Sequence, residues 1–151
     1  MASKGERTVV NAAALVQGIV LVTFPAASTI FTDKSEYGLS STQYGDLFLP
    51  QVVLAIAASL LGAGLVRRIS AKGVYLLGLT CSMVAMVLLL ASTLFKSDQS
   101  AAFPLLLIAT AFVGAGFGLT VPVLNTYTSP PAADAPYTLS FQTTSPARAL
   151  P

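Results

Sequence analysis

Few side chains in this sequence are suited to chemistry, and most of those lie inside long apolar stretches. Gln17, Gln51 and Asn125 are amides, which both donate and accept hydrogen bonds, and Asp46 is the only charged residue within such a stretch. A charged side chain costs roughly 2.5–3.5 kcal/mol at the centre of a membrane helix, whereas amides there bond across helices. These residues therefore predict hydrogen bonding, either between helices or to a solute in a cavity.

Other kinds of chemistry are poorly represented. The chain has one cysteine, Cys81, and no histidine, which removes His-based catalytic pairs, zinc sites and disulfide scaffolds. Its 8 Lys and Arg residues against 6 Asp and Glu residues form no extended basic face, so a nucleic-acid partner is not expected. We expect a protein that is not an enzyme and that has no cofactor and no metal site.

The composition indicates that most of this chain is surrounded by lipid and not by water. Of the 151 residues, 54% are hydrophobic and 9% are charged, against roughly a quarter charged in soluble domains. The mean hydropathy is +0.76, and so few charges cannot cover a globule in water. The sequence therefore predicts an integral protein of the cell membrane, with the lipid bilayer as its main partner.

Four apolar runs, uncharged except for Asp46, are long enough to cross about 30 Å of hydrocarbon at about 1.5 Å per residue. They cover residues 9–31, 44–65, 73–95 and 101–127. Because the connectors are short, neighbouring helices must be antiparallel. We expect an all-α fold of four transmembrane helices over residues 9–128. The first run is interpreted as a retained span, since it is longer than a usual signal peptide core and three more runs follow it; cleavage is the alternative.

The distribution of basic residues predicts the orientation. One side of the membrane would hold Lys4, Arg7, Arg67, Arg68, Lys72 and Arg148, and the other only Lys34 and Lys96. Loops rich in Lys and Arg stay on the cytoplasmic side. Six basic residues against two place both termini in the cytoplasm, with residues 1–8 as a short N-terminal segment.

Residues 129–151 differ in character from the rest of the chain. They contain Pro130, Pro131, Pro136, Pro146 and Pro151, five of the nine prolines, and show no helical or strand periodicity. Such composition predicts a disordered cytoplasmic tail. Two interpretations stay open: a natural flexible tail, or a reading frame lost or a gene truncated near Thr128.

Each polar residue within the four runs has a structural and a functional interpretation. Asp46 lies about one turn into its run, where the helix dipole favours a solvated carboxylate; the alternative is a gate or a substrate contact. Gln17 and Gln51 lie at mid-to-outer depth and Asn125 near the cytoplasmic end, where amides usually bond across helices. The alternative for these amides is a cavity lining, and Gln17 is the main candidate.

The fourth run contains three closely spaced glycines. Gly114, Gly116 and Gly118 include the spacing Gly114-x-x-x-Gly118, which gives a smooth face that another helix can approach closely. We expect these glycines to serve helix packing.

The connector between the second and third runs carries a family resemblance. The major facilitator superfamily of transporters has a loop of the type Gly-x-Leu-Ala-Asp-Arg-x-Gly-Arg-Lys at this place, and Leu65, Arg68 and Lys72 match it in this sequence. Arg67 stands where the family has its acidic residue and Ser70 where it has its second glycine. In the family this carboxylate helps to latch the two halves, so Arg67 puts that latch in doubt and leaves the three matching residues as candidates for a conformational loop.

The fourth run and the order of the four spans also resemble the first third of that family. Proton-driven members often read Leu-x-x-Arg-x-x-Gln-Gly-x-Gly in their fourth helix. This chain keeps Leu107, Gly114 and Gly116 but has Thr110 and Val113 in place of the arginine and the glutamine. The resemblance covers residues 9–128 and argues against the proton-antiporter branch.

The resemblance implies transport of a small solute by alternating access. A complete member has twelve helices in two halves with the substrate between them, so four helices cannot close a pathway alone. The resemblance thus implies an N-terminal portion of a transporter, with an unknown solute as ligand and the missing transporter helices or another membrane subunit as partners. Gln17 and Asn125 would be the main cavity contacts.

Two other classes of protein remain open. Small dimeric four-helix exporters have a similar span count, but they carry a glutamate inside the first helix and residues 9–31 contain none. The other class is a non-transporting four-span protein that packs against a larger partner, for which the glycine face of the fourth run would serve equally well.

Overall fold

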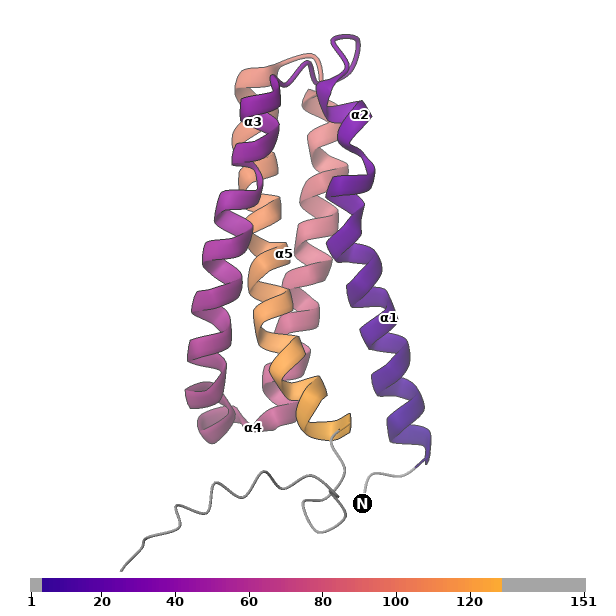
Figure 1. The fold of residues 1–151 in the computed structure, drawn as a ribbon, viewed down its shortest axis with the longest axis vertical. Helices are drawn as coiled ribbons and strands as arrows, with labels where there is room; N and C mark the ends of the chain where they lie inside the picture. The colour runs from indigo at the N-terminus through magenta and orange to yellow at the C-terminus, as the bar shows by residue number, and fades with distance from the viewer. Residues whose placement is uncertain (1–3, 129–151) are drawn as a thin grey trace, which may run out of the picture.

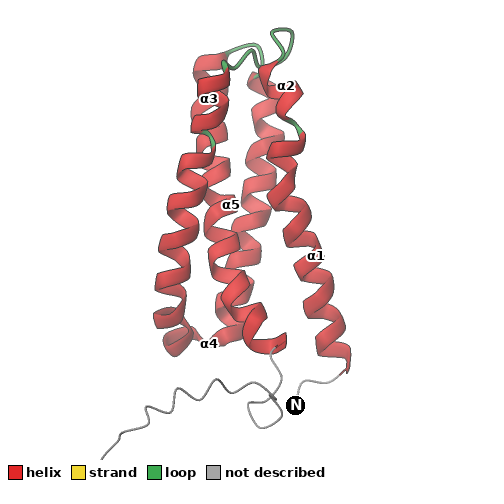
Figure 2. Cartoon of the chain, viewed as in Figure 1, coloured by secondary structure: helices red, strands yellow, loops and turns green. Residues whose placement is uncertain are grey.

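The computed structural model describes residues 4–128, and every regular element within this range is helical. The elements are α1 (Lys4–Ala26), α2 (Ser28–Thr32), α3 (Ser41–Asp46), α4 (Phe48–Ser92), the 3-10 turn η1 (Thr93–Phe95) and α5 (Gln99–Thr128) (Figures 1 and 2). The expected all-helical fold is confirmed. The tail expected over residues 129–151 lies outside the described residues.

Three helical segments are long and apolar enough to cross a membrane. They are Asn11–Thr32, Ser41–Phe95 and Gln99–Asn125. The second contains 55 residues, which at about 1.5 Å per residue is far longer than a bilayer core of about 30 Å. Its length is explained by a reversal of the chain within α4.

Helix α4 folds back on itself at Ser70. This residue has φ 72° and ψ 159°, outside the helical region, and Figure 1 shows the ribbon reversing direction there. Both halves of α4 contact the same stretch of α5, since Ser59 donates a hydrogen bond to the carbonyl of Gly118 and Gly78 lies against Gly116. We call residues 48–69 the first arm of α4 and residues 71–92 the second arm.

The reversal is tighter than the polar connector expected over residues 66–72. The helix continues to residue 69 and resumes at 71, because Val66 and Ala71 pack on the buried cluster of Val74, Leu119 and neighbours. A positive φ is strained for a residue with a side chain. Ser70 offsets part of this strain by accepting a hydrogen bond from the backbone N–H of Gly73 at 3.3 Å, which caps the second arm.

The first helical rod is broken between α1 and α2. Pro25 lies in the last turn of α1, and Ala27 has φ −88° and ψ 14°, which interrupts the helix. The hydroxyl of Tyr44 reaches across and donates a hydrogen bond to the carbonyl of Phe24 at 3.4 Å. The break therefore has a partner from a second helix, as a membrane helix requires.

Residues 33–40 and 96–98 form one end of the molecule, which we call the loop end. Lys96 forms an ion pair of 2.7 Å with Glu36, and Gln99 donates a hydrogen bond of 2.9 Å to the side chain of Gln43. Ser40 and Gln43 form a capping box at the start of α3. Below them the hydroxyls of Tyr37 and Ser92 are hydrogen-bonded at 2.8 Å within the protein. The loop end is thus tied together by polar contacts.

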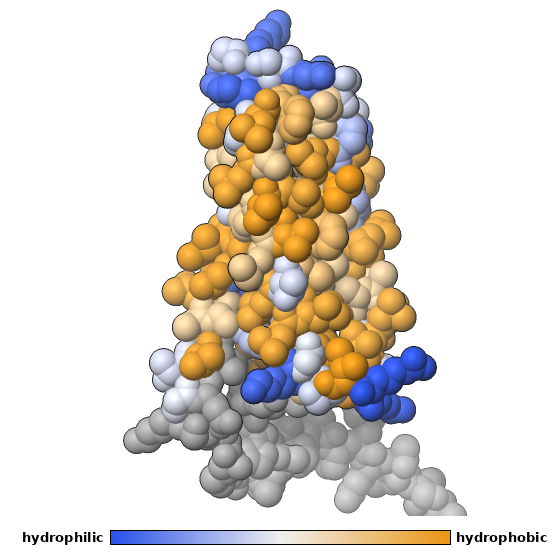
Figure 3. All heavy atoms as spheres, turned by 180° about the vertical axis from the view of Figure 1, so that it is seen from behind, coloured by the Kyte–Doolittle hydropathy of each residue, from blue (hydrophilic) through white to orange (hydrophobic). Residues whose placement is uncertain are grey.

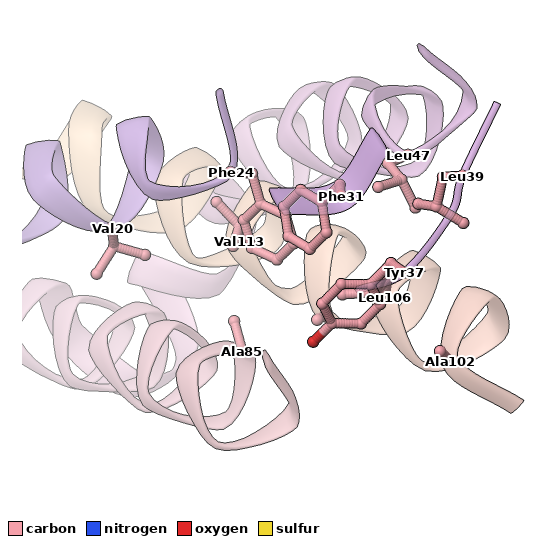
Figure 4. Packing of buried hydrophobic residues seen from close by; sticks show 11 residues of the cluster. Val20, Phe24, Phe31, Tyr37, Leu39, Leu47, Ala85, Ala102, Leu106 and Val113 are labelled. Atoms are coloured by element: carbon pink, nitrogen blue, oxygen red, sulfur yellow. The ribbon is translucent and has the colours of Figure 1, made fainter. Parts of the chain in front are cut away.

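The apolar core is divided into two clusters. The larger one lies toward the loop end, where Phe24 and Phe31 stack with ring centroids 5.8 Å apart (Figure 4). Its buried members are Val20, Phe24, Phe31, Tyr37, Leu39, Leu47, Ala85, Ala102, Leu106, Ala109 and Val113. The smaller cluster joins the two arms of α4 to α5 nearer Ser70, and α1 contributes nothing to it.

The glycines of α5 set the distance between α5 and the arms of α4. A Cβ atom on Gly114 would overlap the backbone of Gln51, with 2.7 Å to its carbonyl carbon, and one on Gly118 would lie 2.9 Å from Cβ of Ala58. On the other side of α5, a Cβ atom on Gly116 would lie 2.8 Å from the carbonyl oxygen of Gly78. Backbone-to-backbone packing on both sides makes α5 the centre of the bundle.

The outer surface between the two ends is apolar. Figure 3 shows hydrophobic residues over most of one face, with hydrophilic residues gathered at its ends. Large side chains such as Leu60, Leu61, Met83 and Leu90 are well exposed. Such a continuous apolar surface is far larger than the patches on ordinary soluble proteins.

We predict that Gly114→Ala destabilises the protein by about 1–3 kcal/mol, because the added methyl group meets backbone atoms that cannot rotate away. Gly64→Ala is the matched control. Its Cβ has nothing within 4 Å, so the gain in helix propensity makes it neutral or stabilising. Reversible unfolding in detergent micelles measures both changes. Equal stabilities of the two variants would contradict the packing role of Gly114.

Candidate functional site

A buried hydrogen bond between two helices lies near the middle of the bundle. The hydroxyl of Ser82, in the second arm of α4, donates to Oε1 of Gln17, in α1, at 2.9 Å. Gln17 is 3% exposed and Ser82 is 5% exposed. Both lie near the centres of their helical rods, so this polar pair lies far from either polar end of the molecule.

Three helices position this pair. The Ser82 hydroxyl lies 2.5 Å from the position a Cβ atom would take on Gly116, so only a glycine there lets α5 approach. The same hydroxyl proton is shared with the carbonyl oxygen of Gly78 in the helix of Ser82, at 3.2 Å. Gln17 is held on the bundle with Val20 and Phe24, which follow it at helical spacing on the buried side of α1.

The side-chain NH₂ group of Gln17 has no hydrogen-bond acceptor among the described residues. Its Nε2 atom is buried and lacks a hydrogen-bond partner, as do Oε1 of Gln51 and the hydroxyl of Tyr75. An unpaired buried polar group costs about 1–3 kcal/mol. Gln17 therefore carries a donor that is costly to the fold and available to another molecule.

Before Gln17, α1 makes little contact with the bundle. Every earlier residue with a described side chain is exposed except Ala13, which is half-buried. In Figure 1 this part of α1 diverges from the other helices toward the N-terminus. Among the described side chains of α1, Gln17 is thus the first buried one counted from the N-terminus.

The structure does not bring the other amides predicted from the sequence to Gln17. Gln51 lies in the first arm of α4, where its backbone packs on Gly114 on the opposite side of α5 from Ser82. Asn125 is exposed near the end of α5, nine residues and therefore about 13 Å beyond Gly116. The predicted pair of cavity contacts, Gln17 and Asn125, is separated in this conformation.

The remaining predicted residues lie at the two ends of the molecule. Asp46 is half-exposed at the end of α3, close to the loop end. Arg68 and Lys72 are exposed on either side of the reversal at Ser70, while Leu65 is half-buried against the smaller core cluster. The loop candidates thus adjoin the end opposite the loop end. We call this the basic end, after Arg67, Arg68 and Lys72.

Charge is confined to these ends within residues 8–128. At the loop end, hydrogen bonds from Ser35 lower the pKa of Asp33, and those from Ser100 lower the pKa of Asp98. The hydrogen bond and the charge of Glu36 raise the pKa of Lys96. These groups are exposed, so they fix turns rather than contribute much stability.

Metal binding has no candidate site within the described residues, because no three His, Cys, Asp or Glu side chains lie together there. The groups in the middle of the bundle are amides and hydroxyls. Their chemistry is neutral hydrogen bonding, without a nucleophile and base pair or a set of metal ligands.

Sequence reasoning missed the partner of Gln17. Ser82 is one of several hydroxyl residues in an apolar run, and Thr110 and Thr120 are equally buried but bond to carbonyls of their own helix. The spacing of Gly78 and Ser82, four residues apart, was a usable signal, because it places a small residue and a hydroxyl on one helix face. Which of these hydroxyls faces Gln17 depends on where α1 crosses the second arm of α4, and the sequence does not show that crossing.

Comparison of the chain with protein-family models, curated proteins and solved structures returns no match. Function is therefore inferred from the residues and their geometry.

We predict that Ser82→Ala is more destabilising than Gln17→Leu. Removing the hydroxyl leaves Oε1 of Gln17 buried without a donor, which costs about 1–3 kcal/mol. Removing the amide leaves Ser82 its second acceptor, the carbonyl of Gly78. In the Gln17→Leu background, Ser82→Ala should cost much less, and a double-mutant cycle on free energies of unfolding measures this coupling. Additive effects would show that the two side chains do not interact.

Proposed function

We propose that the chain crosses the membrane four times, with both termini in the cytoplasm, and that it forms one helix bundle of a solute transporter of the major facilitator type. The first crossing comprises α1 and α2, the two arms of α4 provide the second and third, and α5 is the fourth. Transport would proceed by alternating access, with α1 on the solute side of the bundle.

The membrane part of this proposal is supported by the surface and the charges. The apolar surface lies between two polar ends (Figure 3), and each arm of α4 has about the length needed to cross about 30 Å. Arg67, Arg68 and Lys72 lie at one end, so that end is assigned to the cytoplasm. The loop end holds Asp33, Glu36 and Asp98 besides Lys34 and Lys96 and is assigned to the outside.

The single observation that carries the transport proposal is the half-satisfied amide of Gln17. Polar groups at the membrane midplane are costly and usually mark a pathway or a binding site. A packing residue would need no spare donor, and the bond to Ser82 uses only the oxygen of Gln17. Substrate sites of transporters lie near the midplane between helices, and in the proposed membrane arrangement this amide would lie near the midplane.

The alternative of a non-transporting protein that packs on a partner through its glycine face is less well supported. Gly114 and Gly118 are used against the first arm of α4, and Gly116 against the second arm. None of the three is left for a helix of another protein in this conformation.

We predict the following labelling pattern in intact cells for single-cysteine variants made in a Cys81→Ser background. Ser35→Cys, at the loop end, should react with an impermeant maleimide from outside. Ser70→Cys, at the basic end, should react only after the cells are permeabilised, because the positive charge keeps that end inside. Both positions are exposed. Labelling of Ser70→Cys from outside intact cells would overturn the orientation, and recovery of the protein from the soluble fraction would overturn the membrane assignment.

The transport proposal is tested by uptake of labelled neutral solutes, since residues 8–32, 47–66, 73–95 and 99–128 contain no charged side chain. Because four helices cannot close a pathway alone, the chain is produced together with the membrane subunit that co-purifies with it. These cells should accumulate at least one of a hexose, a polyol, a nucleoside or a neutral amino acid faster than cells that lack the chain. Gln17→Leu should reduce that uptake about tenfold or more.

Thr80→Val is the matched control for uptake. Thr80 is an exposed hydroxyl residue in the second arm of α4 and bonds to the carbonyl of Leu76 in its own helix. Its removal should leave uptake unchanged. No solute accumulating above background when the chain and that subunit are both inserted in the membrane would refute transport and favour the partner-packing alternative.

A further inference from the structure

We propose that Gln17, Ser82 and Tyr75 form a binding site for a neutral solute rich in hydroxyl or carbonyl oxygens, a sugar or a polyol in chemical class. This inference rests on the proposed transport function and gives it a substrate class. Ser82 and Tyr75 were not among the residues expected to contact a solute from sequence.

The three residues lie along one side of the second arm of α4. Tyr75 and Ser82 are seven residues apart, which places them on the same helix face and about 10 Å apart along the axis. Gln17 contacts this face at Ser82. Tyr75 lies on the side toward the basic end, where it packs against the smaller core cluster and its hydroxyl is buried.

The free hydrogen-bonding groups define the ligand. Gln17 has an unpaired Nε2 that offers N–H donors, and Tyr75 has an unpaired hydroxyl that donates and accepts. When α1 moves, the hydroxyl of Ser82 and Oε1 of Gln17 lose each other and become a further donor and acceptor. A ligand that satisfies all three side chains needs several oxygens, with at least one hydroxyl among them to donate to Oε1 of Gln17.

The absence of charge excludes ionic ligands from this class. The nearest charged residue in sequence to Tyr75 is Lys72 at the basic end, and neither residues 73–95 nor residues 8–32 contain one. A phosphate or carboxylate at Gln17 would be buried without a counterion, which is far more costly than burying a hydroxyl. A sugar is therefore favoured over its phosphate or acid.

Binding requires α1 to move, because Gln17 is 3% exposed. The break at Ala27 supplies a hinge near the loop end. Opening costs the Gln17–Ser82 bond and the packing of Val20 and Phe24, which lie between Gln17 and this hinge in the larger core cluster. Hydrogen bonds to the solute would offset part of this cost.

The test is the thermal unfolding of the full chain in lipid nanodiscs with added glucose, mannitol, glucose 6-phosphate or gluconate. A ligand that binds only the folded state raises the unfolding temperature. We expect a rise with glucose or mannitol and none with the two anions. The rise should be lost in Gln17→Leu and reduced in Tyr75→Phe, and it should be kept in Thr80→Val.

Stability without ligand separates this role from a structural one. Gln17→Leu should unfold at the same temperature as the unmodified chain or higher, since it removes an unpaired donor from the core. Loss of the glucose or mannitol effect without loss of stability supports a binding site. No rise with either sugar, a similar rise with the anions, or an unchanged rise in Gln17→Leu would overturn the inference.

Failure of this inference differs from failure of the proposed transport. Solute-dependent stabilisation without uptake would refute transport and keep the binding site. Uptake that is unaffected by Gln17→Leu and Tyr75→Phe would refute this site and keep transport.

Discussion

The close approach of α5 to both arms of α4 is the constraint on which the rest of the structure depends. Gly114 and Gly118 bring one side of α5 against the backbone of the first arm, and Gly116 brings the other side against Gly78 and Ser82. In the membrane proposed for this chain, no hydrophobic effect would drive apolar helices together, so dispersion contacts of this kind would hold them. The reversal at Ser70 then needs to supply only the connection between two arms that α5 already aligns.

This central packing leaves α1 as the least constrained helix. From Gln17 to Phe24 its buried residues contact the bundle, and α2 is fixed by the aromatic stack around Phe31. Toward its N-terminus it has almost no buried side chain. The loop end, by contrast, is joined by the Lys96–Glu36 ion pair and the Tyr37–Ser92 hydrogen bond. Motion within this bundle is therefore concentrated in α1, away from the loop end.

The helical content of this fold was predictable because long uncharged runs separated by short polar segments admit few structures in lipid. The reversal at Ser70 was expected as a longer connector, since Arg67, Arg68 and Lys72 are polar while the tertiary contacts that keep residues 66–69 and 71 helical are invisible in one sequence. Gln17 could be singled out because an amide in an apolar run is rare. Its partner Ser82 could not, because a hydroxyl can bond to its own helix, as Thr110 and Thr120 do.

The position of Gln17 links the packing of α1 on the second arm of α4 to the hydrogen bonding of its amide. Its oxygen is satisfied by Ser82 only while α1 lies against the second arm, and its Nε2 is unsatisfied in that same position. An interhelical bond of this kind is worth about 0.6–2 kcal/mol in a membrane, and a buried unpaired donor has a similar cost. The polar contact at Gln17 therefore adds little net stability to the position of α1, which rests on the burial of Val20 and Phe24. Under the binding proposal, oxygens of a ligand would satisfy this amide, and the ligand would shift α1 only through a difference in its affinity for two positions of that helix.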